Sequence, residues 1–228
     1  MTHIRVIIKL SLFAITLVLF SCEEKESEII SPSGGYQEII FNNGTNVKLG
    51  PQSKATFKKS SSQMYLEGEA FLNVAPGETL FVLTTNGKVR AETGQYRIHS
   101  RRSTMNVFVI SGKATSSNID DQVSKELTDE MYAIYNGKNL ADTNKKAIEQ
   151  MTNDKYWVFN SASIKFILEC ITAQYGVTFK EGDANINKVF SGFVPRDDLQ
   201  IALSIVTRSL GIEYQEENST YILSNSTY

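Results

Sequence analysis

Hydrophobic and polar residues alternate with a period of two through the first half of the chain, which is typical of β-strands with one buried face. In residues 66–74, the positions predicted to face the core are Leu66, Gly68, Ala70, Leu72 and Val74. The opposite face of this strand carries Glu67, Glu69, Phe71 and Asn73. The pattern therefore predicts a half-buried strand.

Other strands are predicted at residues 80–83, which form a short apolar run, and at residues 105–110. Turn signals rich in Asn, Pro, Ser and Gly separate the strands at residues 42–44, 75–77, 86–87 and 111–112. One more strand is expected within residues 126–135, and no helical pattern interrupts the series. Residues 36–138 thus predict an antiparallel all-β domain, either a sandwich or a solenoid-like stack.

The last third of the chain has a helical period. Residues 163–175 carry an apolar stripe that ends at Gly176, and a strand follows. The same order recurs 35 residues later, where Asp197 or Asp198 can cap a helix over residues 199–210. This duplicated strand–helix–strand unit predicts a small α+β domain at residues 156–228, with two helices on one sheet. The fold class is α+β with two domains, separated by a charged linker at residues 139–155.

The N-terminus begins with two basic residues, Arg5 and Lys9, and an apolar run over residues 10–20. Eleven helical residues span about half of a ~30 Å hydrocarbon core, so a signal peptide at residues 1–21 fits better than a membrane anchor over residues 4–20. Ser21 and Cys22 resemble the lipobox of bacterial lipoproteins, which implies a lipid on Cys22 and cleavage before it; the alternative is a chance cysteine.

The residues after Cys22 are acidic or rich in Ser, Pro and Gly. Such a composition cannot bury enough apolar surface to become ordered, so residues 22–35 predict a lipidated polar tether. We expect the protein to face the periplasm from the inner or outer membrane of a bacterial envelope.

Composition excludes several classes of function. The chain of 228 residues has 23 Lys and Arg against 25 Asp and Glu, which disfavours nucleic-acid binding. Removal of the first 21 residues leaves 207, with 21 basic against 25 acidic residues, a net charge of −4. His99 is then the only histidine and Cys170 the only free thiol, so we expect no disulfide, metal or cofactor.

No catalytic triad, phosphate-binding loop or metal-ligand set occurs in the sequence. Glu67 and Glu69 lie two apart on one strand face, which leaves open a pair of carboxylates for glycoside hydrolysis. His99 is expected to be structural, and Cys170, in an apolar helix, is expected to be a small core residue.

Two other groups have alternative interpretations. Arg101 and Arg102 form either a solvated turn or a contact for an acidic partner. Three aromatic residues are expected to be core residues at the start of a domain: Tyr156, Trp157 and Phe159. The alternative is that they form a platform on which sugar rings stack.

The order of motifs resembles the FecR family, which joins a periplasmic β domain to a small C-terminal α+β domain. The matching stretches are Val47–Lys48–Leu49 with Ser53, residues 65–74 (YLEGEAFLNV), residues 81–85 (FVLTT), and Val107–Phe108–Val109 with Ser111 and Gly112. In the C-terminal part of the chain, the residues that match the family are Trp157, Phe159, Tyr175–Gly176–Val177, Phe190–Ser191–Gly192 and Leu199. The resemblance implies structural roles for Leu66, Gly68, Glu69, Ala70, Val74, Gly94, Trp157, Gly176 and Gly192.

Three departures from the family pattern matter. The strand around Gly94 and Tyr96 is degraded, the cytoplasmic segment that controls a sigma factor is missing, and a lipobox replaces the membrane anchor. The resemblance therefore implies a non-enzymatic signalling or scaffolding lipoprotein. Its partner would be another envelope protein, such as the signalling domain of a TonB-dependent outer-membrane transporter. The alternatives are a glycan-binding or hydrolytic lipoprotein, suggested by Glu67 and Glu69, and a decayed copy with a structural role.

Overall fold

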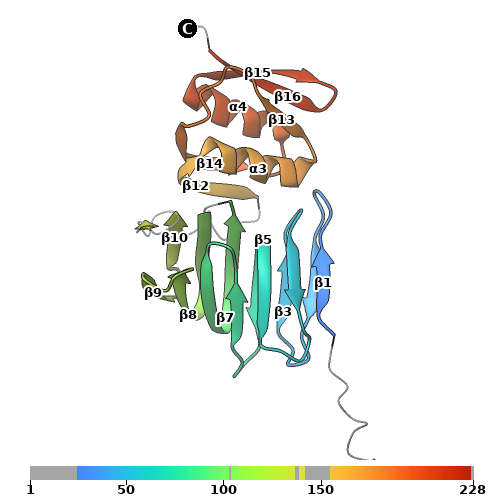
Figure 1. Cartoon of the computed structure of the whole chain (residues 1–228), viewed down its shortest axis with the longest axis vertical. Helices are drawn as coiled ribbons and strands as arrows, with labels where there is room; N and C mark the ends of the chain where they lie inside the picture. The colour runs from blue at the N-terminus through green and yellow to red at the C-terminus, as the bar shows by residue number, and fades with distance from the viewer. Residues whose placement is uncertain (1–24, 103, 137–138, 142–154, 227–228) are drawn as a thin grey trace, which may run out of the picture.

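The computed structural model describes residues 25–102, 104–136, 139–141 and 155–226. In this part of the chain, eleven strands form one large sheet, and two smaller sheets with two helices follow it (Figure 1). The strands of the large sheet are β1 (Ser27–Ile30), β2 (Gln37–Ile40), β3 (Asn46–Leu49), β4 (Lys54–Phe57), β5 (Gln63–Val74), β6 (Leu80–Leu83), β7 (Gly87–Arg101), β8 (Thr104–Asn118), β9 (Ser124–Thr128), β10 (Tyr132–Asn136) and β11 (Asn139–Ala141). We call this part the β unit.

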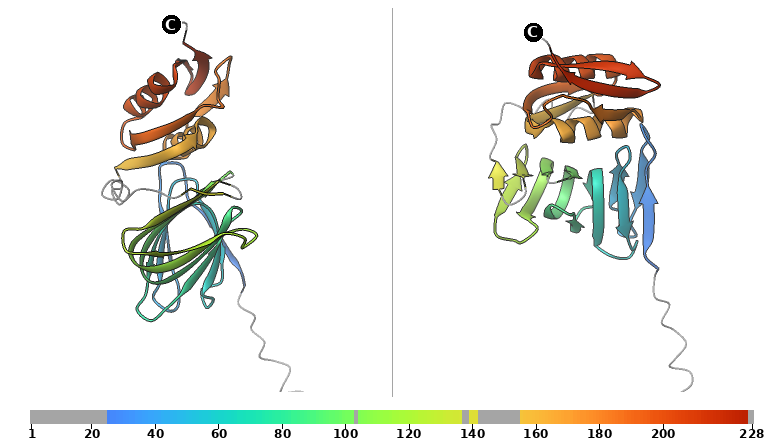
Figure 2. Two further views of the ribbon diagram at one scale, coloured as in Figure 1. Left: turned by 90° about the vertical axis from the view of Figure 1, so that its left-hand side faces the viewer. Right: turned by 45° about the horizontal axis from the view of Figure 1, so that its top comes forward.

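The large sheet rolls over on itself around one hydrophobic core, as the left view of Figure 2 shows. Strand β5 carries the sheet across the roll: residues 64–67 pair with β4, whereas residues 70–73 pair with β3. The change of partner falls at Gly68, whose φ of +106° allows a sharp bend. The expected sandwich or solenoid-like stack is therefore one continuous rolled sheet. It is mostly antiparallel, and β5 and β6 pair in parallel.

Strands β7 and β8 form a long hairpin that bends where Gly94 faces Gly112. The φ of Gly94 is +147°, and a Cβ there would lie 2.2 Å from the Ser111 carbonyl oxygen. The Tyr96 hydroxyl, 2.7 Å from the Glu92 carbonyl oxygen, donates a hydrogen bond at the same bend. The prediction that the strand at residues 105–110 closes at Ser111 and Gly112 is wrong, because a bend with paired backbone replaces the turn. The bend is therefore present even though the family's motif around Gly94 and Tyr96 is degraded in this sequence.

The alternation in β5 is confirmed for its apolar positions, since Leu66, Ala70, Leu72 and Val74 are all buried. Glu69 departs from the pattern: it was expected on the polar face with Glu67, but it is buried. The period of two continues through Gly68, and Glu69 is buried because Arg97 and, from the C-terminal unit, Arg196 cover it.

The N-terminal tether was predicted too long. Residues 27–30 form β1, which pairs with β4, and Ile29 packs against the core. Ser31 is buried, and its Oγ accepts a 2.8 Å hydrogen bond from the Ser53 backbone N–H. Backbone pairing and one apolar contact therefore order a segment whose composition is polar. The expected signal peptide and Cys22 lie outside the described residues.

The region between the two predicted domains contains more strands than expected. Instead of one strand in residues 126–135, β9 and β10 are separated by a turn in which Glu130 has a φ of +62°. Residues 139–141, the start of the predicted linker, form β11 and pair with β10. Residues 142–154 lie outside the described part.

The C-terminal unit, residues 155–226, contains both helices. Helix α3 (Ile164–Tyr175) begins at Ser163, whose Oγ accepts a hydrogen bond from the Phe166 N–H, and ends at Gly176 in a left-handed conformation. Helix α4 (Leu199–Leu210) is capped in the same way by Asp198 and ends at Gly211. The two predicted helices, the cap at Asp198 and the glycine ends are confirmed, and the cap at Ser163 was not predicted.

The remaining strands form two sheets and not the single sheet expected. They are β12 (Tyr156–Ser163), β13 (Thr178–Glu181), β14 (Val189–Pro195), β15 (Ile212–Glu217) and β16 (Thr220–Asn225). Strands β12 and β14 pair with each other, and β16 lies between β13 and β15. Each helix contacts one strand of each sheet, α3 with β12 and β13 and α4 with β14 and β15, so a second core fills the space around the helices.

The two principal hydrophobic clusters fall on either side of residues 142–154, one in the β unit and one in the C-terminal unit. The domain boundaries at residues 138 and 156 stay a prediction. No helix in the described ranges is long and apolar enough to cross a membrane.

Candidate functional site

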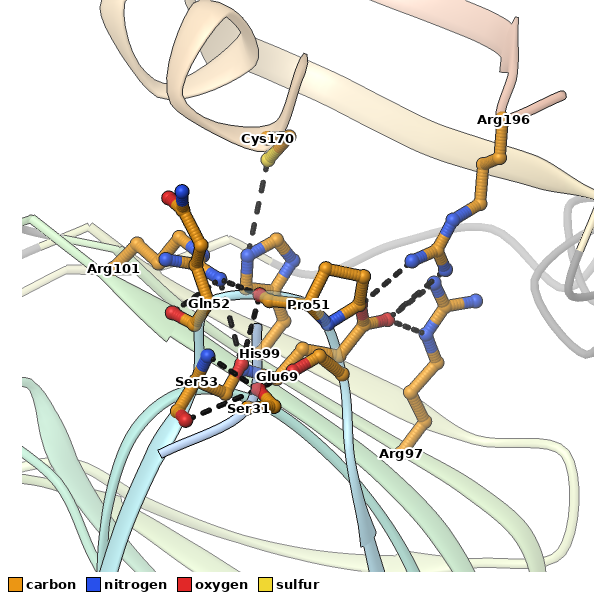
Figure 3. Close-up of polar contacts among 11 residues, drawn as sticks. Ser31, Pro51, Gln52, Ser53, Glu69, Arg97, His99, Arg101, Cys170 and Arg196 are labelled. Atoms are coloured by element: carbon orange, nitrogen blue, oxygen red, sulfur yellow. Dashed lines mark hydrogen bonds and ion pairs between the residues drawn. The ribbon is translucent and has the colours of Figure 1, made fainter. Parts of the chain in front are cut away.

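The C-terminal unit rests on one end of the rolled sheet, where β5 and β7 meet α3 and the loop before α4 (Figures 1 and 3). Polar and charged side chains from both units gather there. We call them the interunit cluster, which consists of Glu69, Arg97, His99, Arg101, Cys170 and Arg196.

Glu69 occupies the centre of the interunit cluster. Its backbone N–H donates a 2.8 Å hydrogen bond to the Ser53 Oγ, and the same Ser53 side chain fills the space that a Cβ at Gly68 would need. The bend at Gly68 and the seryl hydroxyl thus direct the Glu69 side chain toward the C-terminal unit. Glu69 is only 3% exposed.

Two arginines bind the Glu69 carboxylate. Arg97, on the neighbouring strand β7, donates from Nε to Oε1 at 2.7 Å. Arg196, between β14 and α4, donates from Nη1 to Oε1 at 3.2 Å and from Nη2 to Oε2 at 2.8 Å. The Arg196 guanidinium also lies over the Trp157 ring, 5.2 Å from its centroid. Arg196 therefore joins the two units through a two-point, charge-assisted contact.

The charges of this group support one another. Burial alone would raise the pKa of Glu69, but the positive charges of Arg97 and Arg196 outweigh burial and hold the pKa far below its usual range. Burial would likewise lower the pKa of Arg196, and the Glu69 carboxylate reverses that effect and raises it. Glu69 is thus a permanent anion and is not suited to donate a proton as a general acid.

His99 and Cys170 meet across the interface. The His99 ring packs against Phe166 at a centroid distance of 4.9 Å, and its Nε2 lies 3.8 Å from the Cys170 Sγ. Burial lowers the pKa of His99 to about 3, although the Glu69 charge acts in the opposite direction. Burial raises the pKa of Cys170 to about 12. A neutral imidazole beside a protonated thiol is a packing contact. Cys170 is a buried core residue, as the sequence predicted, and His99 is buried beside it.

Arg101 and Arg102, expected either in a solvated turn or against an acidic partner, both take part in the interface region. Arg101 donates from Nη2 to the Pro51 carbonyl oxygen at 2.7 Å. Arg102 forms an ion pair with Glu169 of α3. The acidic group that Arg102 contacts therefore belongs to the same chain.

The structure does not assemble the candidate carboxylate pair. Glu67 is exposed, whereas Glu69 is buried and bound by two guanidinium groups. Trp157 and Phe159 are buried in the second core, and Tyr156 is 38% exposed, so the three aromatic residues form no common platform. The observations that suggested hydrolysis or sugar stacking thus lose their geometric basis.

The remaining motif residues have structural positions. Leu66, Ala70 and Val74 are buried in the first core, and Gly176 ends α3. Gly192 has a φ of +157°, and a Cβ there would lie 2.8 Å from the Phe190 ring. Among the described residues, no group of three or more His, Cys, Asp and Glu side chains could hold a metal ion.

Sequence reasoning missed Arg97 and Arg196. Arg97 could have been found as a basic residue on a strand adjacent to the Glu69 strand, had the pairing been known. Arg196 lies 127 residues from Glu69 and carries no local signal of its role.

In this chain, a rolled β-sheet and a small α+β unit are joined by buried charges. Residues 27–115 match the family described as "FecR protein". The resemblance to the FecR family that the motifs carry is confirmed over this segment.

Two crystal structures share the fold over most of the chain. Both are described as a "putative anti-sigma factor" from Parabacteroides distasonis. One has a TM-score of 0.75 and covers 89% of this chain, and the other has a TM-score of 0.74 and covers 88%. Each is 19% identical in sequence and is covered over 100% of its own length. No curated protein matches the sequence.

Proposed function

We propose that this protein is a lipid-anchored signalling or scaffolding protein of the bacterial envelope that acts by binding another envelope protein. The observation that carries the proposal is the FecR match at residues 27–115, together with a fold shared with those structures over 88–89% of the chain. Regulators of this family act through other proteins, such as sigma factors and transporters. The proposed partner is the signalling domain of a TonB-dependent outer-membrane transporter.

The C-terminal unit offers a surface suited to such a partner. Strand β14 contains no charged residue, and its Val189 and Phe193 side chains are 57% and 40% exposed. Within the described residues, β14 pairs with β12 only. An apolar strand with an unpaired edge can accept an extended segment of a partner by strand addition, which uses backbone hydrogen bonds for affinity.

Affinity purification of the full-length lipidated protein from membranes of its native host tests the proposal. After mild cross-linking, we expect mass spectrometry to identify a TonB-dependent transporter or an envelope regulator. The Val189→Lys variant should capture at least tenfold less of that partner, because a charge would be desolvated in the contact. Ile40→Lys is the matched control, since Ile40 is equally exposed at 57% but lies on β2 of the β unit. Recovery of neither class of protein would contradict the proposal.

A further inference from the structure

The two units meet through a contact that differs from their interiors. Each has its own hydrophobic cluster, and the contact between them includes the Arg196–Glu69 and Arg102–Glu169 ion pairs and a 3.2 Å hydrogen bond from the Gly34 N–H to the Ala173 carbonyl oxygen. A smaller apolar cluster adds Val158 of the C-terminal unit to side chains of β8 and β10. Separation at this contact would leave the first principal core intact and most of the second, of which Cys170 would lose the cover of His99.

The contact is also incompletely packed. A cavity of about 50 Å³ lies between Arg97 and Asn106 on one side and Trp157 and Phe159 on the other. A smaller cavity of about 10 Å³ lies beside Arg196. The Asn106 Oδ1 and Arg196 Nε atoms are buried without a hydrogen-bond partner in the protein. Because cavities and unpaired polar atoms weaken a contact, this interface is less stable than either core.

Arg196 is held firmly within its own unit. It directly follows β14, its backbone N–H donates a 2.8 Å hydrogen bond to the Lys155 carbonyl oxygen, and Asp198 caps α4 two residues later. Only its side chain crosses to the β unit. Glu69 is fixed equally well, by Ser53 and Arg97. The two charges therefore belong to different units and meet at the interface.

We propose that the Arg196–Glu69 ion pair is a latch that holds the C-terminal unit on the β unit, and that the two units separate as folded bodies when this pair is broken. Opening lets water reach Cys170 and the Arg196 guanidinium. It leaves Glu69 paired with Arg97, so the open β unit keeps a balanced charge. A ligand that binds only the open form would shift the equilibrium toward it.

Thiol labelling of Cys170 in the full chain tests the latch. The rate of modification by a maleimide, followed at the Cys170 peptide by mass spectrometry, reports opening because the thiol is buried at the closed interface. We expect Arg196→Ala to raise this rate at least tenfold, and Arg196→Lys to raise it less, since a lysine keeps the charge without the two-point contact. The rate should depend only weakly on urea, because opening exposes little surface compared with global unfolding.

Glu69→Gln gives a second, sharper measurement. The change removes no volume, but it leaves Arg97 and Arg196 facing each other without a counter-charge, so labelling should be faster than in Arg196→Ala. Glu67→Gln and Arg208→Ala are matched controls at exposed positions, and both should label within twofold of the wild type. An unchanged rate in Arg196→Ala would overturn the latch. A raised labelling rate that has the full urea dependence of global unfolding would also overturn it. Circular dichroism shows whether each variant is folded.

Discussion

The role of Glu69 is decided by its immediate neighbours and not by its residue type. Two residues earlier, Glu67 has the same side chain on the same strand but is exposed. The guanidinium groups of Arg97 and Arg196 make Glu69 a buried anion that joins the two units. A carboxylate in this setting contributes through charge balance, because removing it leaves two buried cations.

Glu69→Gln should destabilise the protein by about 3–5 kcal/mol, the usual cost of removing one partner from a buried ion pair. Urea unfolding followed by circular dichroism measures this difference in the free energy of unfolding. Glu67→Gln should change that free energy by no more than about 0.5 kcal/mol, as is usual for exposed positions. Equal effects of the two substitutions would contradict the assignment.

His99 should make stability depend on pH between about 6.5 and 3. Its folded-state pKa of about 3 lies below the ordinary value of 6.5, so only the unfolded chain binds this proton as the pH falls. The free energy of unfolding should therefore decrease as the pH falls below 6.5, by at most about 1.4 kcal/mol per pH unit. Above pH 6.5, the contribution of His99 to this free energy is fully present. The groups that face His99 are Glu69, Arg97, Arg101, Cys170 and Arg196.

Urea unfolding at several pH values between 6.5 and 5 measures this slope, in a range where most carboxylates stay ionised in both states. The His99→Gln variant should show a flatter slope. If wild type and variant lose stability in parallel, His99 is not the group responsible.

At the scale of elements, three glycines shape the large sheet. Gly68 lets β5 pass from one layer to the other, and Gly94 and Gly112 let the β7–β8 hairpin bend while its backbone stays paired. The helices of the C-terminal unit use glycines differently: each helix begins at a capping side chain and ends at a left-handed glycine. Bends in the sheet therefore depend on contacts distant in sequence, whereas the helix ends are local.

Gly94→Ala should destabilise the protein by roughly 3 kcal/mol or more. The new Cβ would meet the Ser111 carbonyl oxygen at 2.2 Å in addition to the strain of a positive φ. Gly77→Ala is the matched control: its φ is +79°, but a Cβ there has open space, so only the backbone strain of about 1 kcal/mol remains. Thermal unfolding compares the two, and a similar loss in both would show that the close contact at Gly94 is unimportant.

The whole molecule consists of a rolled sheet with a second unit seated on one end. Strand β1 is an outer strand of the sheet, and Figure 1 shows that it begins at the end of the sheet opposite the C-terminal unit. A lipid at Cys22 would therefore leave the C-terminal unit directed away from the attachment point. This arrangement suits the proposed binding of a partner by that unit.

Cys22→Ala tests the proposed lipid anchor. We expect the wild type in the membrane fraction and the variant in the soluble periplasmic fraction, because acyl chains contribute about 0.8 kcal/mol per buried CH₂ to membrane binding. Cys170→Ala is the control for loss of a cysteine and should leave the fractionation unchanged. A Cys22→Ala protein that remains in the membrane would refute lipid anchoring.

The sequence by itself determined the features that depend on neighbouring residues. Strand periodicity located β5, β6 and part of β8, and the apolar stripes with their capping residue and glycines placed both helices and revealed the duplicated unit. Only the tertiary structure decided the rest: the ordering of residues 27–35, the rolling of one sheet, the two sheets around the helices, and the burial of Glu69. The reason is physical, since each depends on contacts between distant segments, such as the 127-residue separation of Arg196 and Glu69, which leave no periodic trace in the chain.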